Sequence, residues 1–191
     1  MVDQLLDQHH DDPSVGIAYI YFNFRWTNKQ KLDDLLSSLL KQLAEGQSSV
    51  PDSVKELYGR YVETQRRPPE QELLEALRNV ASLYSKLFLV VDALDECQVS
   101  DGCRNAFIEA LIDLQASTGV NLFTTSRFIP EITDKFDKKD WLEIRATKAD
   151  VERYLEYHIR KSSHTIREME EEITRTISDT VDGMCVLRIL G

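Results

Sequence analysis

Positive charge is scarce in this sequence. Its 191 residues include 33 aspartates and glutamates against 23 lysines and arginines, which gives a formal net charge of -10. Nucleic acids and anionic membrane surfaces attract cationic faces, so this composition argues against both as partners. No apolar run approaches the roughly 20 residues that a membrane-spanning helix needs. The first ten residues contain acids where a secretory signal would carry bases, so we expect no signal peptide.

Cysteine is also rare, with three residues at positions 97, 103 and 185. An odd count without a framework spacing indicates a reducing, cytoplasmic setting. Cys97 and Cys103 offer two metal ligands, and His9 with His10 offers two more. Neither group is completed by a further pair of cysteines or histidines, so we expect no metal site at either.

The phosphate-binding loop Gly-x-x-x-x-Gly-Lys-Ser/Thr is absent. The sequence has seven glycines, and none of them precedes a lysine. In that loop, backbone N–H groups and the lysine cradle nucleotide phosphates. A chain without it lacks the usual main source of affinity for a nucleotide.

The most informative stretch is the apolar run Leu87–Val91, which leads directly into Asp92, Asp95 and Glu96. Such a run is typical of a strand covered on both faces of a parallel sheet. An acid at its end would lie at the carboxyl edge, where open α/β folds bind ligands. In phosphoryl-transfer enzymes that acid binds Mg²⁺, and a second acid orients water. The structural alternative is a buried strand followed by an acidic loop.

Three other segments have the pattern of strands. Residues 16–24 are rich in aromatic and β-branched side chains, and residues 121–127 end in hydroxyl groups and Arg127. Arg127 could contact a phosphate through its planar fork of donors, or form a surface salt bridge. Residues 141–144 alternate between apolar and polar types, which predicts a last strand at the edge of the sheet.

Amphipathic helices separate these strands. The clearest begins at a cap residue, Asn28, ends at Glu45, and carries a leucine stripe that we interpret as core packing. Other helices are predicted over residues 1–10, 51–61, 70–84 and 103–117.

Only helices are predicted after residue 144. Thr147 and Asp150 resemble a capping box that begins the first of them. A second helix is predicted to end near residue 181, and a further apolar segment spans 184–190. The expected architecture is therefore an α/β domain over residues 1–146 and the start of a helical domain over residues 147–191.

Four segments together resemble the NACHT class of P-loop signalling NTPases, within the STAND group. The likeness is greatest to fungal members and to nephrocystin-type N-terminal domains. It is carried by residues 11–21, 89–97, 125–132 and 181–184. The resemblance implies a P-loop NTPase-like parallel sheet with flanking helices, and a helical domain beside the nucleotide. It also implies a switch that controls oligomerisation in NOD-like receptors, with an effector region before it and repeats after it.

The same resemblance assigns roles to individual residues. Asp92 matches the Walker B aspartate that binds the Mg²⁺ of Mg-ATP or Mg-GTP. Asp95 and Glu96 match the acids that influence water activation, and here they are vestigial catalytic candidates. Arg127 matches the sensor arginine near the γ-phosphate.

The sequence departs from this family at its beginning and at its end. The phosphate-binding loop and its preceding strand would come before Met1, and the family continues beyond Gly191, so we expect a truncated module. In the family the missing strand lies between the Arg127 strand and the Trp141 strand. The sheet should therefore have a gap, or close by moving its last strand inward. An unpaired central edge would favour aggregation.

These departures lead us to expect no bound cofactor and no tight ATP binding or hydrolysis by the chain alone. The main alternative is a non-catalytic scaffold that keeps the NTPase fold and binds protein partners or further copies of itself. A hydrolase or kinase using the three acids is a weaker alternative, because no nucleophile, base or phosphate cradle accompanies them.

Overall fold

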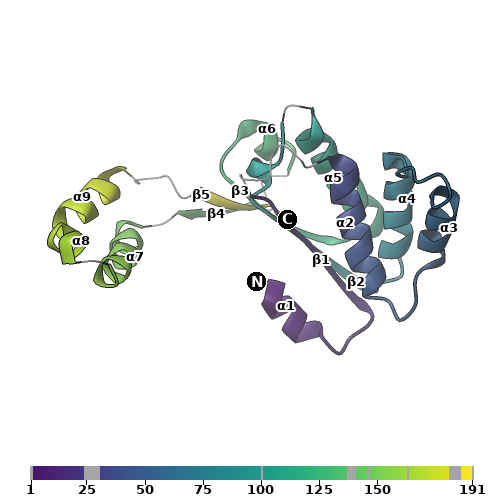
Figure 1. Cartoon of the computed structure of the whole chain (residues 1–191), viewed down its shortest axis with the longest axis horizontal. Helices are drawn as coiled ribbons and strands as arrows, with labels where there is room; N and C mark the ends of the chain where they lie inside the picture. Colours follow the sequence, from purple (N-terminus) through teal and green to yellow (C-terminus); the bar gives the residue numbers. More distant parts are fainter. Residues whose placement is uncertain are drawn as a thin grey trace.

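The computed structural model describes residues 2–23, 31–99, 101–136, 141–145, 147–162, 164–180 and 186–190 (Figure 1). Its strands are β1 (Val15–Tyr21), β2 (Lys86–Asp92), β3 (Asn121–Ser126), β4 (Trp141–Arg145) and β5 (Val186–Leu190). Its helices are α1 (Val2–His9), α2 (Leu32–Glu45), α3 (Asp52–Tyr61), α4 (Glu70–Ala81), the 3₁₀ turn η2 (Leu94–Glu96), α5 (Cys103–Thr118), α6 (Pro130–Thr133), α7 (Lys148–Arg160), α8 (His164–Glu168) and α9 (Glu170–Thr180).

The described strands form one sheet in the order β1-β2-β3-β5-β4. Strands β1, β2 and β3 run parallel to one another. The register places Tyr21 beside Asp92 and Val91 beside Thr124, so the carboxyl ends of the three strands meet at one edge. The predicted α/β fold, with a parallel sheet flanked by helices, is confirmed for this part of the molecule.

The central strand is buried on both faces, as its sequence predicts. Leu89 and Val91 are 0% exposed and Val90 is 2% exposed. Figure 1 shows α2, α3 and α4 on one side of the parallel strands and α1 on the other. An unbroken Leu/Val run therefore suits β2, because both of its faces contact other elements.

The predicted leucine stripe of α2 lies in the core. All six leucines of this helix are buried: Leu32, Leu35, Leu36, Leu39, Leu40 and Leu43. The predicted cap, Asn28, lies outside the described residues, and the helix begins at Leu32. Helix α5 ends at Gly119 as predicted, since its φ of 68° is a left-handed conformation that glycine adopts without strain.

The expectation that Trp141 begins the last strand was wrong, although β4 does lie at the edge of the sheet. Strand β5 follows it in the chain and lies between β3 and β4, antiparallel to both. A later segment thus occupies the predicted gap. Its valine and isoleucine content favours a strand, and its backbone pairs with β3 groups that would otherwise lack partners.

The region after residue 147 begins with helices. Thr147 and Asp150 form the predicted capping box at the start of α7. The second predicted helix is divided into α8 and α9 at Met169, and Figure 1 shows these three helices together, beyond β4 and β5. The expectation that only helices follow residue 144 was wrong, because the chain returns to the sheet through β5. The division between domains at residue 146 stays a prediction. Among the described helices, none has the length and apolar character to cross a membrane.

Candidate functional site

The predicted site lies at the carboxyl ends of β2 and β3. Asp92 is the last residue of β2, and its Oδ1 accepts a hydrogen bond of 2.5 Å from the Thr125 hydroxyl on β3. The same Thr125 oxygen accepts a 2.8 Å hydrogen bond from the Ala93 backbone N–H. Thr125 is 4% exposed, so this bridge fixes the Asp92 carboxylate from the buried side.

Ala93 turns the chain sharply after β2. Its φ of 55° and ψ of 48° are left-handed, which is uncommon for a residue with a side chain. The turn leads into η2 and brings Asp95 back towards β3. An observed left-handed residue beside a charged cluster supports a functional role for the cluster.

Asp95 binds Arg127 in two ways. Its Oδ1 accepts from the Arg127 backbone N–H at 3.0 Å, and its Oδ2 accepts from the Arg127 Nε at 2.5 Å. The Asp95 side chain is 4% exposed, whereas that of Arg127 is 71% exposed. The hydrogen bond and then the charge of Asp95 raise the pKa of the Arg127 guanidinium. Asp95 therefore positions Arg127, while the guanidinium remains open to solvent.

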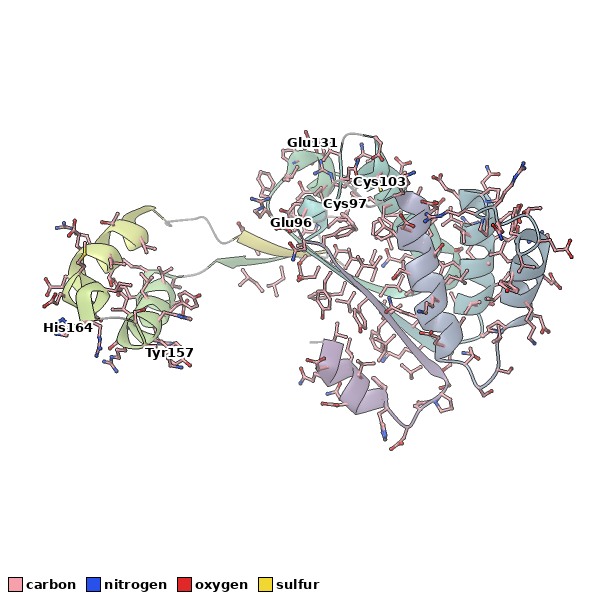
Figure 2. The ribbon with its side chains drawn as sticks, in the orientation of Figure 1. Glu96, Cys97, Cys103, Glu131, Tyr157 and His164 are labelled. Atoms are coloured by element: carbon pink, nitrogen blue, oxygen red, sulfur yellow. The ribbon has the colours of Figure 1, made fainter. Side chains whose placement is uncertain are left out.

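Glu96 lies at the same edge and is partly exposed (Figure 2). Its negative charge also raises the pKa of Arg127, although less than Asp95 does. Its carboxylate has no hydrogen bond or ion pair with another described residue. Both oxygens of the Glu96 carboxylate are thus available to a ligand or a water molecule, whereas one Asp92 oxygen already accepts from Thr125.

Tyr21 completes the edge on the β1 side. It pairs in register with Asp92, and its side chain is largely exposed. Partial loss of solvent around the side chain, and then the negative charges of Asp3 and Asp92, raise the pKa of Tyr21. Its phenol therefore stays protonated at neutral pH and can donate a hydrogen bond.

The donor set at this edge fits a metal ion that arrives with a ligand. Within the described ranges, no group of three or more His, Cys, Asp or Glu side chains gathers as a metal site. Asp92 supplies a carboxylate, one oxygen of which already accepts from Thr125. Mg²⁺ commonly binds through one or two carboxylates together with water and substrate phosphates. The fit is therefore to a Mg²⁺–phosphate ligand rather than to a metal held by protein groups alone.

A family model described as "Nephrocystin 3, N-terminal" matches residues 1–127 of the chain. The match includes strands β1 to β3 and ends at Arg127, so it covers every residue of the candidate edge. The chain belongs to the nephrocystin 3 N-terminal family. Comparison with curated proteins and with solved structures gave no match.

For this nephrocystin 3 N-terminal chain, the structure brings the four predicted residues, Asp92, Asp95, Glu96 and Arg127, to one edge. Their roles stay predictions. Sequence reasoning missed the bridging role of Thr125, although it noted hydroxyl groups at the end of β3. It also missed Tyr21, whose only signal was an aromatic residue near the end of a predicted strand.

Proposed function

We propose that this nephrocystin 3 N-terminal chain is the NACHT-type module of a cytoplasmic, nucleotide-regulated signalling protein of the NOD-like receptor type. The observation that carries the proposal is the Asp92 carboxylate at the end of a buried parallel strand, held by Thr125 beside the Asp95–Arg127 pair. An acid so placed suits Mg²⁺, and an adjacent exposed guanidinium suits a phosphate.

Each residue has a distinct role in this proposal. Asp92 would hold the Mg²⁺ of Mg-ATP or Mg-GTP, which supplies positive charge to the phosphates when bound. Arg127 would contact a phosphate oxygen, and Asp95 is the positioning residue that sets its backbone and its Nε. Glu96 would orient a water molecule. Thr125 holds one Asp92 oxygen and leaves the other for the ion.

We expect the nucleotide to bind weakly. No glycine-rich loop with its lysine is present in the sequence to surround the phosphates. Protein partners, including further copies of the chain, would then bind differently depending on whether a nucleotide occupies the site at Asp92 and Arg127. In a longer parent protein, an effector region before this module and repeats after it would carry the signal.

Isothermal titration calorimetry of the chain with ATP and GTP, each with Mg²⁺, tests the nucleotide role. We expect weak, Mg²⁺-dependent binding that Asp92→Asn reduces about tenfold, because the ion loses its carboxylate. Asp7→Asn is the matched control, since Asp7 is an exposed acid on α1. Equal binding by the Asp92→Asn variant would contradict the role given to Asp92.

A non-catalytic scaffold is the second candidate function. The observation that favours it is β5, which lies between β3 and the edge strand β4. Because β5 pairs with both neighbours, the chain's own backbone and not a ligand closes the sheet at this position. A folded chain that binds neither nucleotide in the same titration, and that sediments as a defined complex with itself or a partner, would support the scaffold.

A further inference from the structure

Two cysteines lie together beside the candidate edge. Cys97 follows η2 directly and is 2% exposed, and Cys103 is the first residue of α5 and is 4% exposed. Both are free thiols. Figure 2 labels them in the same region, close to Glu96. Among the described residues, no group of three or more His, Cys, Asp or Glu side chains gathers around them.

The two thiols lie close enough to shift each other's pKa. Burial and then Cys103 raise the pKa of Cys97, and burial and then the charge of Asp101 raise the pKa of Cys103, which Cys97 lowers to a smaller extent. Backbone bonds fold the intervening loop back on itself: Gly102 N–H donates to Val99 O at 3.1 Å, and Arg104 N–H donates to Gln98 O at 3.0 Å. These bonds bring the two ends of the loop, which carry Cys97 and Cys103, close to each other.

A buried cation lies next to this pair. The Arg104 side chain is 7% exposed, and its Nε has no hydrogen-bond partner among the described atoms. Its charge acts on Cys97, where it opposes the larger effect of burial, which raises the pKa of that thiol to about 12. A guanidinium here stabilises a thiolate that forms transiently, whereas the resting thiols stay protonated at neutral pH.

Cys103 is the thiol that a small molecule can reach. It lines a cavity of about 510 Å³ together with Asp101 and Gly102 of the loop. Lys31 and Arg67 lie on its wall beside the acids Asp33 and Glu70, and Arg67 forms ion pairs with Asp33 and Asp34. The cavity therefore gives a small disulfide access to Cys103.

We propose that Cys97 and Cys103 are a modification site that forms a reversible disulfide by exchange with a low-molecular-weight disulfide of the glutathione type. The Cys103 thiolate attacks one sulfur of the oxidant, which breaks the oxidant's S–S bond and releases one thiolate. Cys97, after losing its proton, attacks the sulfur of Cys103 and releases the second thiolate. The two cysteines are oxidised, the oxidant is reduced to two thiols, and the two protons pass to them.

This inference does not depend on the proposed function. The disulfide would join the end of η2 to the first residue of α5, next to Asp95 and Glu96. Its test measures sulfur chemistry alone, so failure of nucleotide binding and failure of disulfide formation can be distinguished.

The sequence allows a direct test in the unaltered chain. Trypsin cleaves after Lys86 and Arg104, so both cysteines fall on one peptide, residues 87–104, which does not contain Cys185. The folded protein is treated with glutathione disulfide, alkylated, digested and examined by mass spectrometry. We expect this peptide to lose two hydrogen atoms without alkylation or added glutathione, and to regain both alkylation sites after treatment with dithiothreitol.

Single variants test the order of the two attacks. Cys97→Ser should leave a stable glutathione adduct on Cys103, because the resolving thiol is absent. Cys103→Ser should leave Cys97 unmodified, since Cys97 does not line the cavity. The proposal is overturned if the folded wild-type peptide keeps both alkylation sites under oxidant, or if disulfides form only between chains.

Discussion

Arg127 binds the Asp95 carboxylate through both its backbone N–H and its guanidinium Nε. The pair joins η2 to the end of β3, so it sets the distance between the acids of the edge and the next strand. Because the Asp95 side chain is nearly buried and that of Arg127 is exposed, this ion pair fixes the position of the guanidinium and leaves it in contact with solvent.

The first prediction concerns the energy of this pair. A double-mutant cycle with Asp95→Ala and Arg127→Ala should give a coupling free energy of about 1 kcal/mol, because solvent screens the exposed guanidinium. Urea unfolding of the four proteins measures it. Additive single changes would mean that the ion pair does not contribute to stability.

The second prediction concerns the Thr125 bridge. Thr125→Val keeps the shape of the side chain but removes the hydroxyl that donates to Asp92 and accepts from Ala93. We expect the free energy of unfolding to fall by about 2 kcal/mol, since two partly buried polar groups lose their partner. Thr125→Ser keeps the hydroxyl and should lose less. Chemical unfolding of both variants measures these changes. Equal losses of unfolding free energy in the two variants would argue against the hydrogen-bond bridge.

The third prediction compares two glycines. A Cβ at Gly16 on β1 would lie 2.8 Å from Leu87 Cδ1 and 2.9 Å from the Tyr84 ring, so Gly16→Ala should destabilise the fold by about 1–3 kcal/mol. A Cβ at Gly59 on α3 meets nothing within 4 Å, so Gly59→Ala should stabilise it by up to about 1 kcal/mol. Thermal melting of the two variants should therefore shift in opposite directions.

The fourth prediction concerns β5. Ile189→Pro removes a backbone N–H from the strand that pairs with Thr125 on one side and Leu142 on the other. We expect the amides of Thr124–Ser126 to lose protection from hydrogen exchange, and the chain to self-associate through the uncovered edge. Hydrogen-exchange mass spectrometry and light scattering measure these effects, and Ser49→Pro in an exposed loop is the control. Unchanged exchange in β3 would show that β5 does not protect this edge.

The elements that the sequence predicted are those decided by local pattern. Leu87–Val91 reads as a doubly covered strand because its apolar run has no polar break, and the α2 leucines recur at helical spacing. Thr147 and Asp150 indicate the start of their helix, because a capping box depends on side-chain hydrogen bonds within one turn. Each of these signals is contained in a few neighbouring residues.

The features that the sequence did not predict depend on distant partners or on unusual backbone. The place of β5 is decided by pairing with strands far away in the chain. Ala93 adopts a left-handed conformation that alanine rarely takes, so the residue pattern does not predict this turn. The sequence does not decide whether Arg127 contacts a phosphate or forms a salt bridge. In the structure, the fold of η2 brings Asp95 to Arg127. The contact between Cys97 and Cys103 likewise depends on how their loop folds.

The position of β5 also bears on how the chain is synthesised. The ribosome produces β3 and β4 well before the segment that lies between them, with three helices made in the interval. Until then, among the described strands β3 has only β2 as a neighbour and β4 has none, and closing the sheet requires a contact between residues far apart in the sequence. Contacts between residues far apart in the sequence form slowly. During this period the nascent chain has unpaired strand edges, and chaperones are then most needed to protect them.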